Sequence, residues 1–475
     1  MDTGKHYQGQ ERGLLWKRPF RRITPFHHNA EEPAWKVMTQ ADMLREYYPS
    51  GHKINDPQYY HNLVKYDQEK KEFFTQEVFR VAVPLQKIIT TQQLVHLTGN
   101  DIHLELSDSE TTKEKQELMR QLQQGWLDKG MERLFYQLCK SVKITGDGAI
   151  AFFMQEGKLK AKSLSYLNGD TLYPHYDDNG ELCTFIRKYM GRDNGMYETT
   201  FIEVWDCHTF RRYRSYNAYS VHGDSVNVST KGIPEIPGYR LIESHTHPFP
   251  YVPVVYHRED SGPCWSFSQD NIDKYELALS ALCQNNMAYA FPIMVLRGDD
   301  IQINGDIYGN VKAITMGSDD HAEYLSAPQE AENFRLQLDT LLRMIFMGSF
   351  TVLPPEVKGG NLPGVTIKLL YSPSIEKAMT DAKAFEISIE KMCRLFQHGY
   401  GIEQKALHLY TNLHVISWIE PYIHQNTAEL VSSLCNLANS GIISRQTASE
   451  HSTFASNDEW QRIKTESKGA ANQTD

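Results

Sequence analysis

The spacing of apolar residues predicts helix over much of the first 145 positions. One helical segment is expected from residue 42 to about residue 93, interrupted at Pro84, and another from residue 112 to residue 142. Glu114 places negative charge near the start of the second segment, where the helix dipole favours it. Candidate N-caps for this segment are Ser107, Asp108 and Ser109.

Between residues 149 and 216 the period becomes strand-like. Asp177-Asp178-Asn179-Gly180 is a strong hairpin signal, because Asn and Gly tolerate the positive φ of such turns. We therefore expect an antiparallel meander here, followed by loop and extended chain over residues 217–250. The runs rich in aromatic and β-branched residues that predict strands are 149–153, 172–176, 182–189, 199–205 and 210–216.

Two further helices bracket a small insert. Apolar positions predict a helix over residues 270–291 and another over residues 330–346, with Pro328 at the boundary that proline favours. The insert between them, residues 297–328, contains β-like pieces at 301–303 and 311–315 and several acidic turns.

The remainder is helical around one irregular segment. Residues 352–364 hold three prolines and three glycines, so a loop is expected. Residues 365–370 have the composition of a strand. Helices are predicted at 374–398, ended by Gly399 and Gly401, at 426–439, and after Ser444, with a polar, disordered end after about residue 464.

Composition narrows the class of protein. A chain of 475 residues is long enough for two or three substructures, and 23% charged with 40% apolar residues is typical of a folded protein. No window approaches the roughly 18 apolar residues of a membrane helix, and the polar N-terminus does not resemble a signal peptide, so synthesis in the cytosol is expected. Seven scattered cysteines without a Cys-x-x-Cys pair predict reduced, mostly buried thiols.

Charge bears on nucleic-acid binding. The formal net charge of −10 argues against a broad face that grips nucleic acid, since grip depends on Lys and Arg neutralising phosphates. It is compatible with a protein past which DNA slides. The first thirty residues hold Lys17, Arg18, Arg21 and Arg22, and form either a solvated terminus or a basic arm that ties down a neighbouring subunit, capsid protein or nucleic acid.

Candidate catalytic motifs are weak. The turn Thr145-Gly146-Asp147-Gly148-Ala149 lacks the Gly-Lys-Ser/Thr ending of a phosphate loop and follows a helix, so a plain helix-to-strand turn is favoured. His245-Thr246-His247 has no third ligand at a recognisable spacing, so loop histidines are favoured over a metal pair. Acid pairs that could hold Mg²⁺ all lie in turn-like contexts where aspartate is ordinary: Asp177-Asp178, Asp299-Asp300 and Asp319-Asp320.

One basic and aromatic cluster lies inside the folded body. Arg211, Arg212 and Arg214 alternate with Tyr213 and Tyr216, a composition that can stack nucleic-acid bases. On a strand Arg212 and Arg214 share one face and Arg211 takes the other. A solvated or subunit-contacting strand is therefore the favoured interpretation.

The order of these elements resembles that of the portal proteins of tailed bacteriophages. Val252-Pro253-Val254-Val255-Tyr256-His257 ahead of the helix start at Asp270 is similar to the family's entry into its first stem helix. Pro292-Ile293-Met294-Val295-Leu296-Arg297-Gly298 is similar to its exit. Residues 437–447, with 457–460 and 462–463, are similar to the closing segment, so the resemblance covers about residues 77–466.

The resemblance implies an α+β fold with named parts. These are an N-terminal arm (1–40), a wing of helices and antiparallel β meander (41–269), stem helix 1 (270–296), a small α/β clip (297–328), stem helix 2 (329–347), the tunnel loop with the following wing helix (348–406), and a helical crown with a disordered tail (407–475). The strand-like residues 365–370 depart from the helix that the family has there.

The resemblance also implies two functional sites. Residues expected at the DNA channel are Val357, Lys358, Gly359, Gly360, Asn361 and Lys368. Acidic clip residues expected to dock a packaging motor or adaptor are Asp299, Asp300, Asp306, Asp319 and Asp320. A ring of about twelve copies would carry a formal charge of about −120, and an acidic bore repels phosphates.

The implied function is a ring, without cofactor or catalysis, at one capsid vertex of the virion, assembled in the host bacterial cytoplasm. Implied partners are copies of the chain itself, the terminase motor, head-completion or tail adaptor proteins, the major capsid and scaffolding proteins, and double-stranded DNA passing without sequence recognition; no membrane is involved. Alternatives are a metal-dependent nuclease or nucleotidyltransferase that uses one of the aspartate pairs, and another capsid-associated structural protein.

Overall fold

The computed structural model describes residues 38–67, 70–107, 112–193, 197–216, 235–289, 294–297, 302–306, 310–315, 321–324, 331–353, 364–423, 427–452 and 459–471. The chain forms two compact units, Met1–Thr91 with Arg133–Ser349, and Gln92–Glu132 with Phe350–Asp475. The division falls within the helices α2 (Leu85–Thr98) and α4 (Met131–Thr145).

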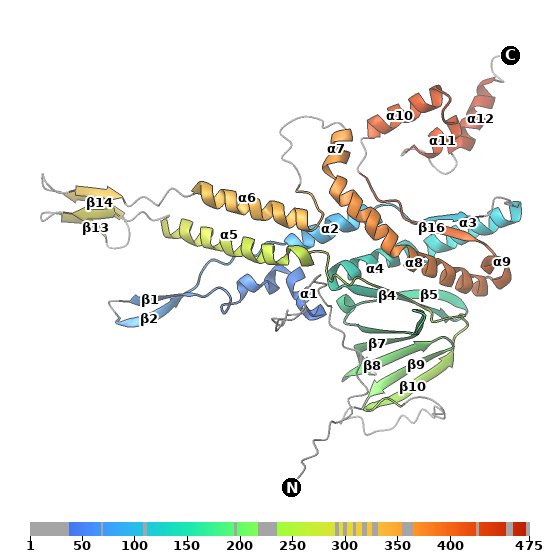
Figure 1. Cartoon of the computed structure of the whole chain (residues 1–475), viewed down its shortest axis with the longest axis horizontal. Helices are drawn as coiled ribbons and strands as arrows, with labels where there is room; N and C mark the ends of the chain where they lie inside the picture. Colours follow the sequence, from blue (N-terminus) through green and yellow to red (C-terminus); the bar gives the residue numbers. More distant parts are fainter. Residues whose placement is uncertain are drawn as a thin grey trace, which may run out of the picture. The chain divides into compact units, whose positions relative to one another are not determined.

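A five-stranded antiparallel meander is the largest sheet of the first unit (Figure 1). It confirms four of the five predicted strands, and Gly180 at φ 85° closes the predicted turn. The fifth strand of this sheet lies where loop and extended chain were predicted, while residues 217–234 lie outside the described residues. In spatial order the strands are β10 (Tyr239–Thr246), β9 (Thr209–Ser215), β8 (Tyr197–Asp206), β7 (Leu182–Asp193) and β6 (Thr171–Tyr176).

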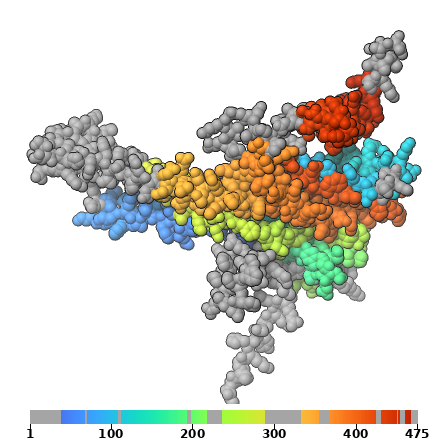
Figure 2. All heavy atoms as spheres, turned by 45° about the horizontal axis from the view of Figure 1, so that its top comes forward, coloured from blue at the N-terminus to red at the C-terminus, as the bar shows by residue number. Residues whose placement is uncertain are grey.

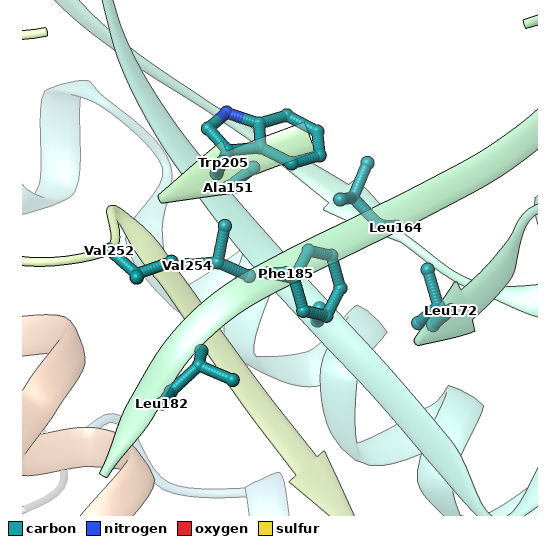
Figure 3. Packing of buried hydrophobic residues seen from close by; sticks show 9 residues of the cluster. Ala151, Leu164, Leu172, Leu182, Phe185, Trp205, Val252 and Val254 are labelled. Carbon is teal, nitrogen blue, oxygen red and sulfur yellow. The ribbon is translucent and has the colours of Figure 1, made fainter. Parts of the chain in front are cut away.

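A second sheet has the order β11 (Val254–Arg258), β4 (Asp147–Gln155), β5 (Lys158–Leu164). The predicted strand at 149–153 lies in this sheet, and β5 and β11 were not predicted. Side chains from both sheets form one apolar cluster around Phe185 and Trp205, whose ring centroids are 5.9 Å apart (Figure 3). The two sheets therefore share a buried core.

Charged side chains also join these sheets. The carboxylate of Glu203 on β8 accepts hydrogen bonds from Lys162 on β5 (3.1 Å) and Arg187 on β7 (2.9 Å), and Arg187 also donates to the buried Asp170 (2.7 Å). Burial opposes ionisation of Glu203, but the charges of Lys162 and Arg187 outweigh it and lower the pKa of that carboxyl. A buried charge that is paired in this way is held in one geometry.

The helical part of this unit packs α5 (Gln269–Tyr289) against α6 (Ala331–Gly348) (Figure 1). The hydroxyl of Ser268 at the start of α5 donates to the carbonyl of Ile345 near the end of α6 at 2.8 Å, so the two helices run antiparallel. Trp265, fully buried, stacks on Tyr47 of α1 (Gln40–Tyr47) with ring centroids 5.8 Å apart. Both predicted helices are confirmed.

The prediction of one long helix over residues 42–93 is wrong for the middle of this range. Beyond α1 the chain forms short 3-10 turns and then a hairpin of β1 (Leu63–Asp67) and β2 (Glu72–Gln76) before α2 begins. Apolar residues of the hairpin coincide with helical spacing by chance. Pro84 favours extended chain in the residue before it, so helix starts only after it.

The helix predicted over 112–142 is two helices, α3 (Lys113–Asp128) and α4. Gly130 between them adopts φ 65°, which ends the first helix. Thr112, not one of the three earlier candidates, caps α3 by accepting the Lys115 amide at 3.3 Å. Asp108 and Ser109 lie outside the described residues.

The insert between α5 and α6 consists of antiparallel strand pairs wherever it is described. β12 pairs with β15, and β13 pairs with β14, which confirms the predicted β-like pieces. The helical component of the expected α/β clip is not seen among these residues. The strands are β12 (Met294–Arg297), β13 (Gln302–Asp306), β14 (Asn310–Thr315) and β15 (His321–Tyr324).

The second unit is mainly helical. Trp126 of α3 packs edge-on against Phe396 of α8 (Ser372–Glu403), with ring centroids 5.2 Å apart, and Lys129 pairs with Glu403 at 2.9 Å. The other elements are β3 (His103–Leu106) paired with β16 (Val415–Trp418), α9 (Leu407–Thr411), α10 (Thr427–Asn439), α11 (Arg445–Glu450) and α12 (Glu459–Ala471).

Three predictions in this unit are corrected. Residues 365–370 belong to a helix, α7 (Gly364–Leu370), because the β propensity of Val and Ile is weak and yields to packing against α8. Gly399 and Gly401 do not end α8; a Cβ at Gly401 would lie 3.0 Å from the backbone of Leu407, so close packing explains that glycine. The polar end continues as helix to Ala471.

All seven cysteines are free thiols, as predicted, but only Cys139 and Cys393 are buried.

Candidate assembly and channel site

One face of α5 holds a stretch of backbone by side-chain hydrogen bonds. The stretch is residues 77–84, which we call the strap. Acceptors four residues apart on α5 meet amides two residues apart on the strap: Glu276 Oε1 accepts the Val83 amide (2.8 Å), Ser280 Oγ the Val81 amide (2.9 Å), and Gln284 Oε1 the Phe79 amide (3.1 Å).

The two spacings match for a geometric reason. Four residues of helix rise about 6 Å, and two residues of extended chain span about 6.6 Å. Alternate amides of an extended strap therefore fall beside successive turns of α5. The side chains of α5 thus accept the hydrogen bonds that the backbone carbonyls of a neighbouring strand would accept in a sheet.

His52 joins the same helix from the turn after α1. Its Nδ1 lies 2.7 Å from Glu276 Oε1, and its Nε2 lies 2.9 Å from the carbonyl oxygen of Glu46. A backbone carbonyl only accepts, and Glu276 Oε1 already accepts the Val83 amide, so both ring nitrogens donate. Burial opposes the charge on His52, but Glu276 outweighs it and raises the pKa of the imidazole.

Further charged side chains surround this contact. Lys53 pairs with Asp273, whose other oxygen accepts from Gln269 at 2.6 Å. The carboxyl of Glu46 is fully buried, and burial, together with the nearby Asp273, raises its pKa. The α5 side chains thus fix the chain that precedes the strap as well as the strap itself.

The α5–α6 pair leaves an open groove of about 690 Å³ on another side of α5. On α6, Leu336, Met344 and Met347 share one helical face and are 66%, 51% and 77% exposed. Part of α6 lies at the molecular surface in Figure 2. The groove is lined by Lys274, Leu277, Ala278, Ala281, Asn333, Phe334, Leu336, Gln337, Thr340 and Leu341.

The residues predicted for the channel and the clip are only partly described. Lys368 lies on α7 and its side chain is exposed. Asp306 is the last residue of β13, paired in register with Asn310. The remaining predicted residues, Val357, Lys358, Gly359, Gly360, Asn361, Asp299, Asp300, Asp319 and Asp320, lie outside the described residues.

The glycine-bearing turn at residues 145–149 is a helix-to-strand turn, as predicted. Asp147 in this turn accepts hydrogen bonds from Gln40 Nε2 (2.7 Å) and Tyr256 Oη (3.1 Å). Burial raises the pKa of Asp147 to about 6, although both hydrogen bonds favour the charged form. A buried carboxyl at this position opposes binding of a phosphate.

The two histidines near the end of β10 have separate partners. His247 Nε2 lies 2.9 Å from the Asp206 carbonyl, and His245 Nδ1 lies 3.4 Å from a Glu243 carboxyl oxygen. Burial lowers the pKa of His247. Nowhere in the described part of the chain do three or more His, Cys, Asp or Glu side chains gather in a way that could hold a metal ion.

The arginines Arg211 and Arg212 on β9 bond to other residues of the same sheet. Arg212 donates to Tyr189 Oη (2.7 Å) and lies over the ring of Phe201 (4.6 Å), and Arg211 pairs with Asp206. Arginines bonded to strand neighbours are not arranged to stack bases. Both arginines lie on a strand, as expected from the sequence, and their partners are neighbours in the same sheet.

Sequence patterns missed the strap and the hairpin. The available signal was polar residues at positions i, i+4 and i+8 of an otherwise amphipathic helix, namely Glu276, Ser280 and Gln284. Such a row is ordinarily a solvated face. Its use as a row of acceptors depends on a backbone segment almost 200 positions earlier in the chain.

Comparison with known proteins identifies the family. Residues 28–473 match the family described as "Phage portal protein, SPP1 Gp6-like". Since the match spans most of its length, the chain belongs to this family of phage portal proteins. No protein with a curated description matches the chain.

Two solved structures are similar at low identity. One is from the neck of an empty GTA particle, at 12% identity and TM-score 0.38, covering 80% of this chain and 90% of that chain. The other is from the virion of a native gene transfer agent particle, at 12% identity and TM-score 0.37, covering 92% and 95%. Within the described segments, no helix combines the length and hydropathy needed to cross a bilayer.

The raised pKa of Asp147 predicts a pH dependence of stability. The folded state retains this proton up to about pH 6, whereas an unfolded aspartate loses it near pH 4, so its contribution to stability falls as pH rises between these values. Asp147→Asn should abolish this pH-dependent loss in the free energy of unfolding, which is roughly 2–3 kcal/mol. The unfolding midpoint of the variant, measured from pH 4 to 7, should equal that of the wild type at low pH and exceed it at pH 7.

The exposed Asp260→Asn variant is the matched control and should follow the wild-type profile. An Asp147→Asn profile parallel to wild type throughout would contradict the assignment.

The strap predicts amide protection controlled from α5. Ser280→Ala removes the acceptor of the Val81 amide, so hydrogen exchange in residues 77–84 should accelerate about tenfold, equivalent to about 1.4 kcal/mol. Mass spectrometry of peptides from this segment measures the rate. Lys274→Ala, an exposed change on the same helix, should leave it unaltered; equal rates in wild type and Ser280→Ala would refute the contact.

Proposed function

We propose that the chain is the repeating subunit of a portal ring at one vertex of a phage capsid, through which double-stranded DNA is packaged and ejected. The observation that carries this proposal is the match of residues 28–473 to the portal family. The ring is about dodecameric, has no catalytic role, and resides in the virion after assembly in the bacterial cytoplasm.

The antiparallel helix pair supports an assignment of the parts of the chain. α5 and α6 are the stem helices, within 270–296 and 329–347, and the strand pairs between them are the clip, 297–328. A helix of 21 residues spans about 30 Å, enough to separate the clip from the two sheets. The wing is 41–269, the tunnel loop and next wing helix 348–406, the crown 407–475, and the arm 1–40.

The channel makes only weak contacts with the DNA that passes through it. A subunit charge of −10 gives a ring whose field repels phosphates, so DNA does not adhere while a separate motor drives it. Residues 357–361, with Lys358 and Asn361, touch the duplex backbone transiently and do not read bases. The exposed Lys368 on α7 adds a positive charge close in sequence to this loop.

The clip is the docking surface for proteins outside the capsid. Its five aspartates, Asp299, Asp300, Asp306, Asp319 and Asp320, give it a negative character suited to basic surfaces of a terminase motor or of head-completion and tail adaptors. The wing and crown face the major capsid and scaffolding proteins. No specific observation favours a nuclease or nucleotidyltransferase.

Electron microscopy and native mass spectrometry of the purified protein test the ring. We expect closed rings of about a dozen copies with an axial channel wide enough for a DNA duplex, because the chain belongs to a portal family and repeated heterologous contacts can close a ring. Incubation with Mg²⁺ and DNA or nucleotide should give no hydrolysis. A protein that stays monomeric under all assembly conditions, or that cleaves phosphodiesters unaided, would overturn the proposal.

A further inference from the structure

The β1–β2 hairpin exposes an apolar face. In its register Tyr66 lies opposite Phe73 and Val64 opposite Thr75, so these four side chains share one face. Val64, Tyr66 and Phe73 are 69%, 50% and 76% exposed, and the two rings contact each other at 5.0 Å. The aromatic side chains of Tyr66 and Phe73 therefore pack mainly against each other.

The exposed area is large for such a small element. A buried aromatic residue covers about 200 Å², so Val64, Tyr66 and Phe73, which share this face, expose on the order of 300 Å² of apolar surface. That is at the lower end of the range for the largest patch of a typical monomer, and somewhat less than half of the roughly 800 Å² that one partner buries in a standard interface. A lone two-stranded hairpin is also only marginally stable in water.

The hairpin is nevertheless held in place at its base. The strap follows β2 directly and is fixed to the Glu276–Ser280–Gln284 row of α5. Arg80 in the strap also donates to the Tyr60 carbonyl (2.9 Å) and to Asn62 Oδ1 (2.7 Å), just before β1. Both ends of the hairpin are thus tied to the strap, and through it to α5.

The α5–α6 groove provides a surface of matching character. Of its ten lining residues only Lys274 is charged, and Ala278 and Ala281 leave it hollow. The groove residues of α5 lie about 60–160° round the helix from the centre of the strap row; they are Lys274, Leu277, Ala278 and Ala281. The hairpin and the groove are thus different surfaces on different sides of one helix.

We propose that the hairpin face of one copy seats in the α5–α6 groove of the next copy. The proposal rests on the ring of the proposed function and names the surfaces that close it. Contact between two unlike surfaces is heterologous, and repeated around an axis it closes a ring in which every copy has both surfaces covered. The hairpin face is mainly apolar, the groove carries a single charge at Lys274, and the exposed faces of Leu336, Met344 and Met347 enlarge the apolar area on the groove side.

Paired variants of the hairpin test this interface. Tyr66→Ser with Phe73→Ser should raise the protein concentration at which half the subunits assemble by at least tenfold. The matched control, Leu63→Ser with Phe74→Ser, changes residues of similar type on the opposite hairpin face and should shift it less than threefold. Circular dichroism and the thermal midpoint of the dissociated subunit should agree among all variants.

Cross-linking locates the contact directly. In a full chain whose five unburied native cysteines are changed to Ser, Phe73→Cys combined with Thr340→Cys should form disulfide-linked multimers on oxidation, whereas Phe74→Cys with Thr340→Cys and each single variant should not. Rings that assemble normally from the Tyr66/Phe73 variant without this cross-link would overturn the interface and leave the proposed function intact. A wild-type protein that forms no ring would instead refute the proposed function.

Discussion

Backbone amides that leave water need acceptors, and this requirement explains how α5 organises the first unit. No strand among the described residues pairs with the strap, and its alternate amides are satisfied by Glu276, Ser280 and Gln284 on successive turns of one helix. Glu276 also accepts from His52, which ties the turn after α1 to the same point. Loss of this helix would leave the strap, the hairpin and that turn without their attachment.

The surrounding elements keep α5 in position. Its first turns are buried with Trp265 and Tyr47, and its start is bonded to the end of α6, so the helix pair is fixed at the end away from the insert. The sandwich of two sheets is held by its own apolar cluster and by the Glu203 ion pairs. A rigid base with an antiparallel helix pair is the geometry that a portal stem requires in our proposal.

Sequence patterns predicted elements whose periodicity is dictated by burial. The α5 and α6 helices and the meander around Gly180 were found because one face of each packs against a core. Patterns failed where local preference was weak or where the partner is distant in sequence: the β1–β2 hairpin has no buried face, α7 is β-branched yet helical, and the strap depends on α5. Of the predicted site residues, only Lys368 has a described side chain, so the channel and clip assignments stay predictions.

We propose that this chain forms the portal of a phage particle. Its location in the particle is the most direct test, because a portal breaks the symmetry of the capsid at a single vertex. Particles assembled with a C-terminally tagged chain should show electron-dense label at one vertex only when imaged by cryo-electron microscopy. Label at all vertices, distributed over the shell, or absent from purified particles would contradict the account.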